Sequence, residues 1–242
     1  KVEKLAYLYG PTSYTPKVKM CGISKVETIP AVVEAKPNYM GLVFAPSKRQ
    51  VTVDQAKTLV EELHKQYAKT YSAVEAPMNA GTAQDSKEFV QENPNFESIK
   101  TVGVFVNETV DNLVAIANEV NLDAVQLHGD EDETFIQSLK ECTNVKVWKA
   151  VQIRSAADAE AWIDSSADML LFDAYHKDER GGTGEVFDWS CLDEFERPFM
   201  LAGGIDSTNV ARAIRTVRPY GIDISSGIET DGAKDGEKIK AF

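Results

Sequence analysis

A carboxylate and a glycine-rich loop follow a short apolar segment in the second half of the chain. Residues 169–172 are all apolar, without alternation, which is typical of a strand buried on both faces of a parallel sheet. Asp173 ends this run, and a loop containing the sequence GGTG at 181–184 leads to Asp188, which is placed to cap a following helix. Because catalytic side chains of parallel α/β proteins lie at the carboxyl ends of strands, Asp173 is a candidate catalytic acid.

Glycines and small hydroxyl residues follow the last two apolar segments of the chain. They are Gly203 and Gly204 in one loop, and Ser225, Ser226 and Gly227 in the next. In a (β/α)8 barrel this corner often binds phosphate, because glycine lets the ligand approach backbone N–H groups. The alternative is that the glycines only permit tight turns. Two such loops in adjacent positions favour a phosphate site.

Apolar segments of strand length alternate with amphipathic segments along most of the chain. Strands are predicted at residues 18–21, 39–44, 101–106, 124–127, 145–150, 169–172, 199–202 and 222–224. Helices are predicted at 53–67, 110–120, 132–142, 156–165, 208–217 and 237–242. This alternation over about 225 residues predicts an α/β protein of the (β/α)8 TIM-barrel class, with a single domain at 18–242. A doubly wound open sheet competes with it, but no GxGxxG motif follows the first predicted strand.

Three regions depart from this regular alternation. Residues 1–17 contain glycine and proline breakers and are predicted to be an extension or linker. Residues 68–100 are polar, contain two prolines and show no sustained period, so we expect an insertion there. Near the start of the predicted barrel, Ser24 and Glu27 have the spacing of a capping box, and Pro30 is expected to kink or delay the helix that follows.

The composition is typical of a soluble globular protein, with 43% hydrophobic and 26% charged residues. No apolar run approaches the roughly 20 residues that a membrane helix needs. The formal net charge of -12 argues against a broad nucleic-acid-binding face, although backbone N–H groups can still bind one small phosphate. Cys21, Cys142 and Cys191 are odd in number and widely spaced, which predicts no disulfide framework and a cytoplasmic location. Cys142 and Cys191 are expected to be small buried residues.

A series of short motifs stands near the predicted strand ends, in order along residues 18 to about 239. They read VKMCGI at 18–23, GLVF at 41–44 with SKR at 47–49, VGVFVN at 102–107, AVQLHG at 124–129, LLFD at 170–173, GGTG at 181–184 with FDW at 187–189, LAGGI at 201–205 and DISSGIE at 223–229. No single motif is specific, but the combination resembles the phosphoribosylanthranilate isomerases of tryptophan biosynthesis. The predicted insertion and Pro30 depart from the family pattern without touching these motifs.

The resemblance implies an Amadori rearrangement, in which N-(5′-phosphoribosyl)anthranilate becomes 1-(2-carboxyphenylamino)-1-deoxyribulose 5-phosphate. An acid protonates the ribose ring oxygen as the ring opens, and a base removes the proton at C2′. No redox change occurs, so the resemblance implies no cofactor and no metal. It implies Cys21 as the general base and Asp173 as the general acid. Because a thiol acts as a base only when it is ionised, cationic neighbours that lower the pKa of Cys21 are expected.

The resemblance also implies which residues bind the phosphorylated substrate. Arg49 is expected to bind the anthranilate carboxylate, since a guanidinium binds carboxylates through two parallel hydrogen bonds. Gly182 belongs to the loop that is expected to cover the substrate. His128, at the end of the fourth predicted strand, either lines the site or is structural, and Asp223 is interpreted as structural. The expected substrate-binding residues are thus Arg49, His128, Gly182, Gly203, Gly204, Ser225 and Ser226.

Three other functions compete with this interpretation. An isomerase acting on an aminoimidazole ribonucleotide uses the same chemistry but is expected to have two aspartates, so Cys21 favours the anthranilate substrate. Indole-3-glycerol phosphate synthase would need a lysine at the end of the first strand, and Lys19 is expected to point away from Cys21. A binding or regulatory module that has lost catalysis is disfavoured by Cys21 and Asp173. Because the chain does not begin with Met, a fusion to or association with another tryptophan-pathway enzyme is also left open.

Overall fold

Eight parallel strands close into a barrel in the computed structural model, which describes residues 14–75, 98–174 and 188–242. The strands are β1 (Lys17–Cys21), β2 (Tyr39–Val43), β3 (Lys100–Phe105), β4 (Ala124–Leu127), β5 (Lys146–Ile153), β6 (Met169–Ala174), β7 (Phe199–Ala202) and β8 (Gly221–Ile224). Each pairs with the next, and β8 pairs with β1 to complete the ring. The predicted single-domain (β/α)8 TIM-barrel class is confirmed.

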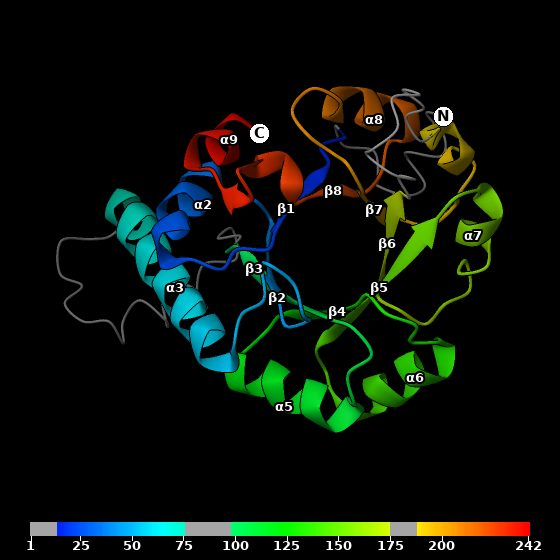
Figure 1. Cartoon of the computed structure of the whole chain (residues 1–242), viewed down its shortest axis with the longest axis horizontal. Coiled ribbons are helices and arrows are strands. Elements are labelled where there is room, and N and C mark those ends of the chain that lie inside the picture. The colour runs from blue at the N-terminus through cyan, green and yellow to red at the C-terminus, as the bar shows by residue number, and fades with distance from the viewer. Residues whose placement is uncertain (1–13, 76–97, 175–187) are drawn as a thin grey trace.

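Helices surround this ring of strands, as the view down the barrel in Figure 1 shows. They are η1 (Val26–Thr28), α2 (Ile29–Ala35), α3 (Val53–Glu75), α5 (Val110–Val120), α6 (Glu133–Cys142), α7 (Ala156–Glu160), η2 (Trp189–Leu192), α8 (Val210–Val217), η3 (Ser226–Ile228) and α9 (Gly236–Ala241). A short antiparallel pair, β9 (Glu229–Thr230) and β10 (Ala233–Lys234), precedes α9. Within the described ranges, no helix is long and apolar enough to cross a membrane.

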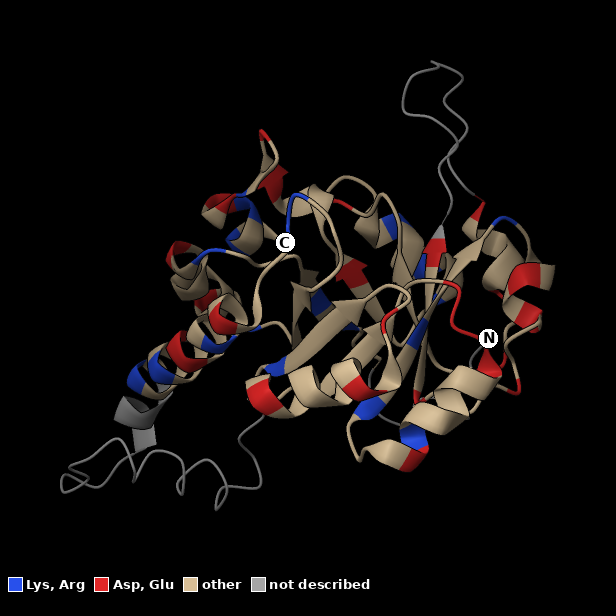
Figure 2. Cartoon of the chain, turned by 60° about the horizontal axis from the view of Figure 1, so that its bottom comes forward, with Lys and Arg blue, Asp and Glu red and all other residues tan. Residues whose placement is uncertain are grey.

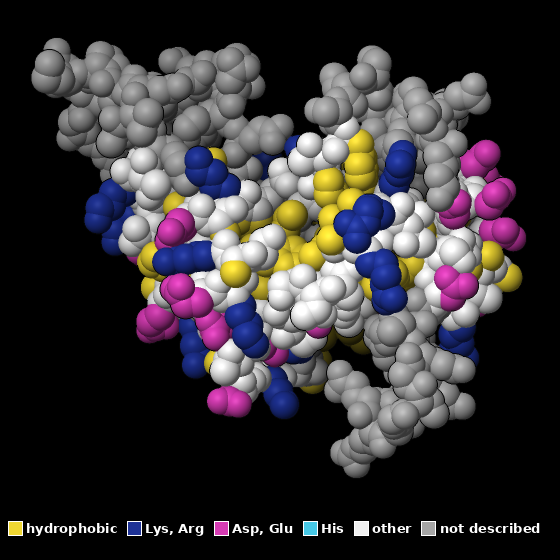
Figure 3. All heavy atoms as spheres, turned by 90° about the horizontal axis from the view of Figure 1, so that it is seen from above, with side chains coloured by type: hydrophobic (Ala, Val, Ile, Leu, Met, Phe, Trp, Pro, Cys, Tyr) yellow, Lys and Arg dark blue, Asp and Glu magenta, His cyan; other side chains and the backbone are white. Residues whose placement is uncertain are grey.

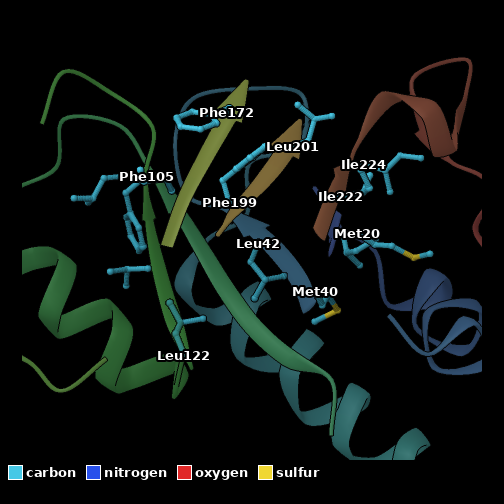
Figure 4. Close-up of a cluster of buried hydrophobic side chains, with 14 of the residues drawn as sticks. Met20, Met40, Leu42, Phe105, Leu122, Phe172, Phe199, Leu201, Ile222 and Ile224 are labelled. Atoms are coloured by element: carbon cyan, nitrogen blue, oxygen red, sulfur yellow. The ribbon is translucent and has the colours of Figure 1, made fainter. Parts of the chain in front are cut away.

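The larger part of the core lies between the strands and the surrounding helices. The buried stripe of α3 illustrates how the sequence produces it, since Ala56, Leu59, Val60 and Leu63 recur at helical spacing. Side chains from neighbouring strands meet there, as Figure 4 shows for residues of β6 and β7. The rings of Phe172 and Phe199 have centroids 5.0 Å apart. Both faces of the strands are therefore covered, as expected for a parallel sheet.

A smaller buried cluster contains Leu171, Met200 and Ala202 with residues from other strands. Side chains two positions apart lie on the same face of a strand, so Leu171 shares its face with Asp173. Phe172, between them, belongs instead to the larger core. The alternation along β6 therefore directs Asp173 to the same side as the small cluster, inside the barrel.

The first helical region differs from the prediction. The residue that caps η1 is Lys25, and it makes no side-chain capping hydrogen bond, so the predicted capping box of Ser24 and Glu27 is wrong. Pro30 occupies the first turn of α2, where the missing N–H of proline leaves no helical hydrogen bond unmade. Pro30 therefore delays this helix rather than kinking it.

Two predicted helix ends are also corrected. Helix α3 continues to Glu75 instead of ending at residue 67, so the first residues of the predicted insertion are helical. Helix α7 ends at Glu160 instead of 165, because the chain tightens there into turns whose N–H groups bond three residues back. Residues 76–97 of the predicted insertion, and most of the predicted extension, lie outside the described residues.

Asp188 caps the segment after β6, as predicted, and its side chain accepts a hydrogen bond from the N–H of Ser190. The segment that it caps is the short 3-10 helix η2. The predicted burial of Cys142 and Cys191 is wrong, because Cys142 is exposed at the end of α6 and Cys191 is partly exposed.

Candidate active site

The carboxyl ends of the strands surround a cavity of about 450 Å³. Almost all of the predicted site residues line it: Cys21, Arg49, His128, Asp173, Gly203, Gly204, Ser225 and Ser226. Gly182 lies outside the described residues. The structure therefore brings together, at one end of the barrel, side chains that the sequence separates by about 200 positions.

Cys21 is the last residue of β1 and is only 8% exposed. Gly41 on the neighbouring strand makes room for it, because a Cβ at position 41 would lie 2.8 Å from Sγ of Cys21. Burial raises the pKa of the Cys21 thiol, while the positive charges of Lys19 and Lys234 act in the opposite direction. The expected lowering of this pKa is thus wrong, since burial outweighs the cationic neighbours.

Lys19 lies on the same face of β1 as Cys21, because residues two apart in a strand share a face. The prediction that Lys19 points away is therefore wrong. Its side chain is fully buried, and Nζ lies 2.9 Å from Oδ2 of Asp223 on β8. Burial works against the charge of Lys19, but Asp223 and Cys21 offset it and raise the pKa of the ammonium. Asp223 is thus more than structural packing, since it also lines the cavity.

Asp173 and His128 meet within the cavity. Nε2 of His128 lies 3.3 Å from Oδ2 of Asp173, and the two side chains are 37% and 31% exposed. His128 directly follows β4, whereas Asp173 is the fifth residue of β6. Of the two alternatives for His128, a place in the site wall is the one that the geometry supports.

Arg49, in the loop after β2, forms a bidentate ion pair with Glu229. Its Nε and second guanidinium nitrogen lie 2.6 and 2.9 Å from the two carboxylate oxygens. Glu229 also accepts a hydrogen bond from Lys234, at 2.8 Å. The Arg49 guanidinium, opposed by burial and helped by Lys234, lowers the pKa of Glu229 to about 2. Glu229 therefore holds Arg49 at the cavity wall with its guanidinium charged.

Gly22 allows the Arg49 side chain to pass close to the backbone. Its φ is +79°, and a Cβ at this position would lie 2.4 Å from Cδ of Arg49. A side chain at position 22 would therefore be strained by its backbone conformation and would displace Arg49.

The predicted phosphate corner is formed by the ends of β7 and β8. Gly203 and Gly204 both have positive φ, +88° and +60°, which glycine adopts without strain. Ser225 is held in place from two sides, since it donates to the carbonyl of Cys21 at 3.2 Å and its own carbonyl accepts from Lys234 at 2.8 Å. These contacts link the corner to the strand that carries the thiol.

Four functional residues were not assigned a role from the sequence. Lys19 and Asp223 form an ion pair next to Cys21, whereas Glu229 and Lys234 connect Arg49 to Ser225 through hydrogen bonds. The parity of β1 could have identified Lys19. Asp223 and Glu229 act through partners 204 and 180 positions away, so no local pattern indicates them. Lys234 contacts Glu229 and Ser225 nearby in the sequence, but its position has meaning only once Glu229 meets Arg49.

Residues of both charges alternate along the ribbon in Figure 2, and their side chains are interspersed over the face drawn in Figure 3. The face in Figure 3 has no continuous basic patch among the described residues. In the same part of the chain, no group of three His, Cys, Asp or Glu side chains is arranged to bind a metal.

Comparisons with known proteins identify relatives over nearly the whole chain. Residues 64–242 match the family model described as N-(5′-phosphoribosyl)anthranilate (PRA) isomerase. The N-(5′-phosphoribosyl)anthranilate isomerase of Thermoanaerobacter sp. (strain X514) is 42% identical over 228 residues, which cover 93% of this chain and 95% of that protein.

Solved structures give the same result. The phosphoribosyl anthranilate isomerase from Thermotoga maritima is 32% identical, with a TM-score of 0.71 over 94% of this chain and 97% of that chain. A structure of such an isomerase with reduced 1-(o-carboxyphenylamino)-1-deoxyribulose 5-phosphate is 30% identical, with a TM-score of 0.69 over 94% and 96% of the two chains. The resemblance in the strand-end motifs is thereby confirmed, and the chain belongs to the N-(5′-phosphoribosyl)anthranilate isomerase family.

Proposed function

We propose that the chain isomerises N-(5′-phosphoribosyl)anthranilate to 1-(2-carboxyphenylamino)-1-deoxyribulose 5-phosphate, as a step of tryptophan biosynthesis. One observation carries the proposal beyond family membership. A thiol and a carboxyl group, Cys21 and Asp173, line the same cavity of about 450 Å³ as the glycine–serine corner formed by β7 and β8. This volume falls in the range of small-molecule sites.

The reaction needs one proton donor and one proton acceptor. Asp173 donates a proton to the ribose ring oxygen, and the bond from that oxygen to C1′ breaks to give a Schiff base. The thiolate of Cys21 then removes the proton at C2′, and the resulting enolamine tautomerises to the ketone. Proton transfer by positioned groups of this kind typically contributes 10²–10⁴-fold to a rate.

Charged and backbone groups at the two ends of the cavity suit the two ends of the substrate. The guanidinium of Arg49 binds the anthranilate carboxylate at one end, while Glu229 orients it from behind. The backbone at Gly203, Gly204, Ser225 and Ser226 binds the phosphate at the other. Oδ1 of Asp223 is buried without a hydrogen-bond partner among the described residues, so it can accept a bond from a ribose hydroxyl.

The position of Lys19 bears on the competing indole-3-glycerol phosphate synthase activity. Lys19 shares a face with Cys21 but is absent from the cavity lining, where it is replaced by its partner Asp223. An ammonium that is fully buried and paired with Asp223 does not reach a substrate. The aminoimidazole isomerase remains the alternative with the same chemistry, and the thiol of Cys21 favours the anthranilate substrate.

A direct assay with both substrates tests the proposal. The purified chain is given N-(5′-phosphoribosyl)anthranilate, with turnover followed by the fluorescence of the anthranilate group, and separately the aminoimidazole ribonucleotide. We expect turnover of the anthranilate substrate and a much lower kcat/KM for the other. Turnover of only the aminoimidazole substrate, or of neither, would contradict the proposal.

The cellular setting is part of the same proposal. A thiol that acts as a base must stay reduced, which suits the cytoplasm. Association with another enzyme of tryptophan biosynthesis stays a proposal, and co-purification of the chain with its pathway partners tests it.

A further inference from the structure

Gln126, on β4, connects to the proposed acid Asp173 through His128. Nε2 of Gln126 lies 3.0 Å from Nδ1 of His128, and Nε2 of His128 lies 3.3 Å from Oδ2 of Asp173. Gln126 is 1% exposed and lines the cavity. A buried amide, an imidazole and a carboxylate therefore lie in one row across the wall of the site, with a hydrogen bond between the first two and a close nitrogen–oxygen contact between the last two.

The amide of Gln126 bears on which nitrogen of His128 carries the hydrogen, because it lies 3.0 Å from Nδ1. An amide NH₂ group only donates, so Nδ1 of His128 must accept and cannot carry a hydrogen. The hydrogen of the neutral imidazole is then on Nε2, which faces Asp173. The opposite orientation of the amide would leave a buried NH₂ group with two unpaired donors. The orientation observed leaves only Oε1 without a partner among the described residues, and an unpaired acceptor is the smaller penalty.

The backbone around His128 is fixed by contacts with buried groups. The N–H of His128 donates to the carbonyl of Phe105 at 2.8 Å, and the N–H of Gly129 donates to Glu131 at 2.8 Å. Lys149 donates to the carbonyl of Gly129 at 2.7 Å and pairs with Glu131. The side chain of His128 is partly exposed, but these hydrogen bonds hold the backbone of residues 128 and 129 in place.

We propose that Gln126 is a positioning residue, which places the hydrogen of the neutral His128 imidazole on Nε2, so that His128 stabilises the carboxylate that Asp173 becomes. The inference rests on the proposed function, and it assigns a separate role to each carboxyl oxygen of Asp173. Oδ2 faces Nε2 of His128 at 3.3 Å, and Oδ1 is left to deliver the proton to the ribose oxygen. Once that proton has left, the N–H of His128 stabilises the negative charge on Asp173.

The tautomer can be measured without any turnover. Long-range ¹H–¹⁵N correlation spectra distinguish the two neutral tautomers and the imidazolium, and the chain has only three histidines. His128→Asn assigns the signal. We expect the Nε2–H tautomer in the unchanged chain, a mixture in Gln126→Leu, and a hydrogen on Nδ1 in Gln126→Glu, whose carboxylate only accepts. A hydrogen on Nδ1 in the unchanged chain, or an unchanged tautomer in Gln126→Leu, would overturn the inference.

Kinetics provide the second readout. Gln126→Leu is expected to lower kcat roughly 10-fold, the scale of one hydrogen bond to a charged group, with little change in KM. The double variant with His128→Asn should be no slower than His128→Asn alone, because both act on Asp173 through one path. Gln137→Leu, the same change on the exposed face of α6, is the control and should leave kcat unchanged.

These outcomes separate the inference from the proposed function. If the unchanged chain lacks isomerase activity, the proposed function fails, and the spectra still decide the tautomer. If activity is present but Gln126→Leu retains full kcat with a folded near-ultraviolet dichroism spectrum, the positioning role is refuted. Gln126→Glu repeats the test with a side chain of nearly the same shape.

Discussion

The ammonium of Lys19 lies 2.9 Å from Oδ2 of Asp223, across the junction where β8 closes the barrel onto β1. Lys19 is fully buried, and Asp223 is 9% exposed. Cys21 stands two residues after Lys19, on the same face of β1. The pair therefore joins the first strand to the last and places a positive charge beside the proposed base.

Removing one member of this pair should destabilise the fold strongly. Lys19→Met leaves the Asp223 carboxylate buried without its partner, for which we expect a loss of about 3–5 kcal/mol in the free energy of unfolding. Adding Asp223→Asn should recover part of that loss. Urea unfolding measures both, with Lys57→Met as the control, because the Lys57 pair with Glu119 is exposed and should contribute little to stability. Equal effects of the two lysine variants would contradict the buried pair.

The ionisation of Cys21 should control the pH dependence of the reaction. Burial raises the pKa of this thiol above its ordinary value of 9.0, and the base is the deprotonated form. Activity that depends on the thiolate should therefore rise with pH through the neutral and alkaline range. The rate at which iodoacetamide alkylates Cys21, measured by mass spectrometry, should also rise with pH. In Lys19→Met the same rate should be reached only at a higher pH, because the positive charge beside the thiol is gone. Alkylation of Cys21 that does not change with pH would refute this account.

The pair between Arg49 and Glu229 should stabilise the fold only above acid pH. The pKa of Glu229 falls from its ordinary value of 4.5 to about 2, so the stabilisation is complete above pH 4.5 and disappears as the pH falls toward 2. Because Arg49 is partly exposed, we expect Glu229→Gln to cost about 1–2 kcal/mol at pH 7. Urea unfolding at pH 7 and pH 3 should show the difference from the unchanged chain shrinking at pH 3. If the difference in the free energy of unfolding were larger at pH 3 than at pH 7, the prediction would be contradicted.

Alanine substitutions at two glycines with the same backbone conformation distinguish the effect of backbone strain from the effect of displacing Arg49. Gly22 and Gly232 have φ of +79° and +77°, but a Cβ would meet Arg49 at position 22 and nothing within 4 Å at position 232. Both alanine variants should lose about 1–2 kcal/mol of stability through strain. Only Gly22→Ala should also raise KM, by roughly 10-fold or more, because the displaced guanidinium loses a charged hydrogen bond to the substrate. A similar KM in the two variants would show that Arg49 does not depend on Gly22.

The sequence predicted the features that depend on local patterns. Strands β4 and β7 and helix α5 were predicted with the observed bounds, because apolar periodicity and turn residues are local. Asp173 could be identified because parallel strands all place their carboxyl ends at one rim, whereas the role of Cys21 was predicted from the resemblance to the family. The ion pair of Arg49 could not be predicted from the sequence, because its partner Glu229 is 180 positions away and meets it only when the barrel closes.

Burial effects were also beyond a reading of the sequence. The pKa of Cys21 follows from how completely β1, β2 and β8 enclose it, and the sequence indicates the charges nearby but not that enclosure. The length of α3 past residue 67 likewise has no clear local signal, because the polar residues there break the apolar period without breaking the helix. Lys19 is the exception, since strand parity alone would have placed it beside Cys21, although it was predicted to point away.

The central claim is that Cys21 and Asp173 exchange protons with one substrate, and paired variants test it most directly. The measurement is kcat for Cys21→Ser and Asp173→Asn, together with the affinity of each for the reduced product analogue, with Cys142→Ser as an exposed-cysteine control. We predict that each site variant loses at least about 10²-fold in kcat while binding the analogue nearly as tightly as the unchanged chain. Turnover at the unchanged rate in either variant would remove that residue from the mechanism and contradict the account.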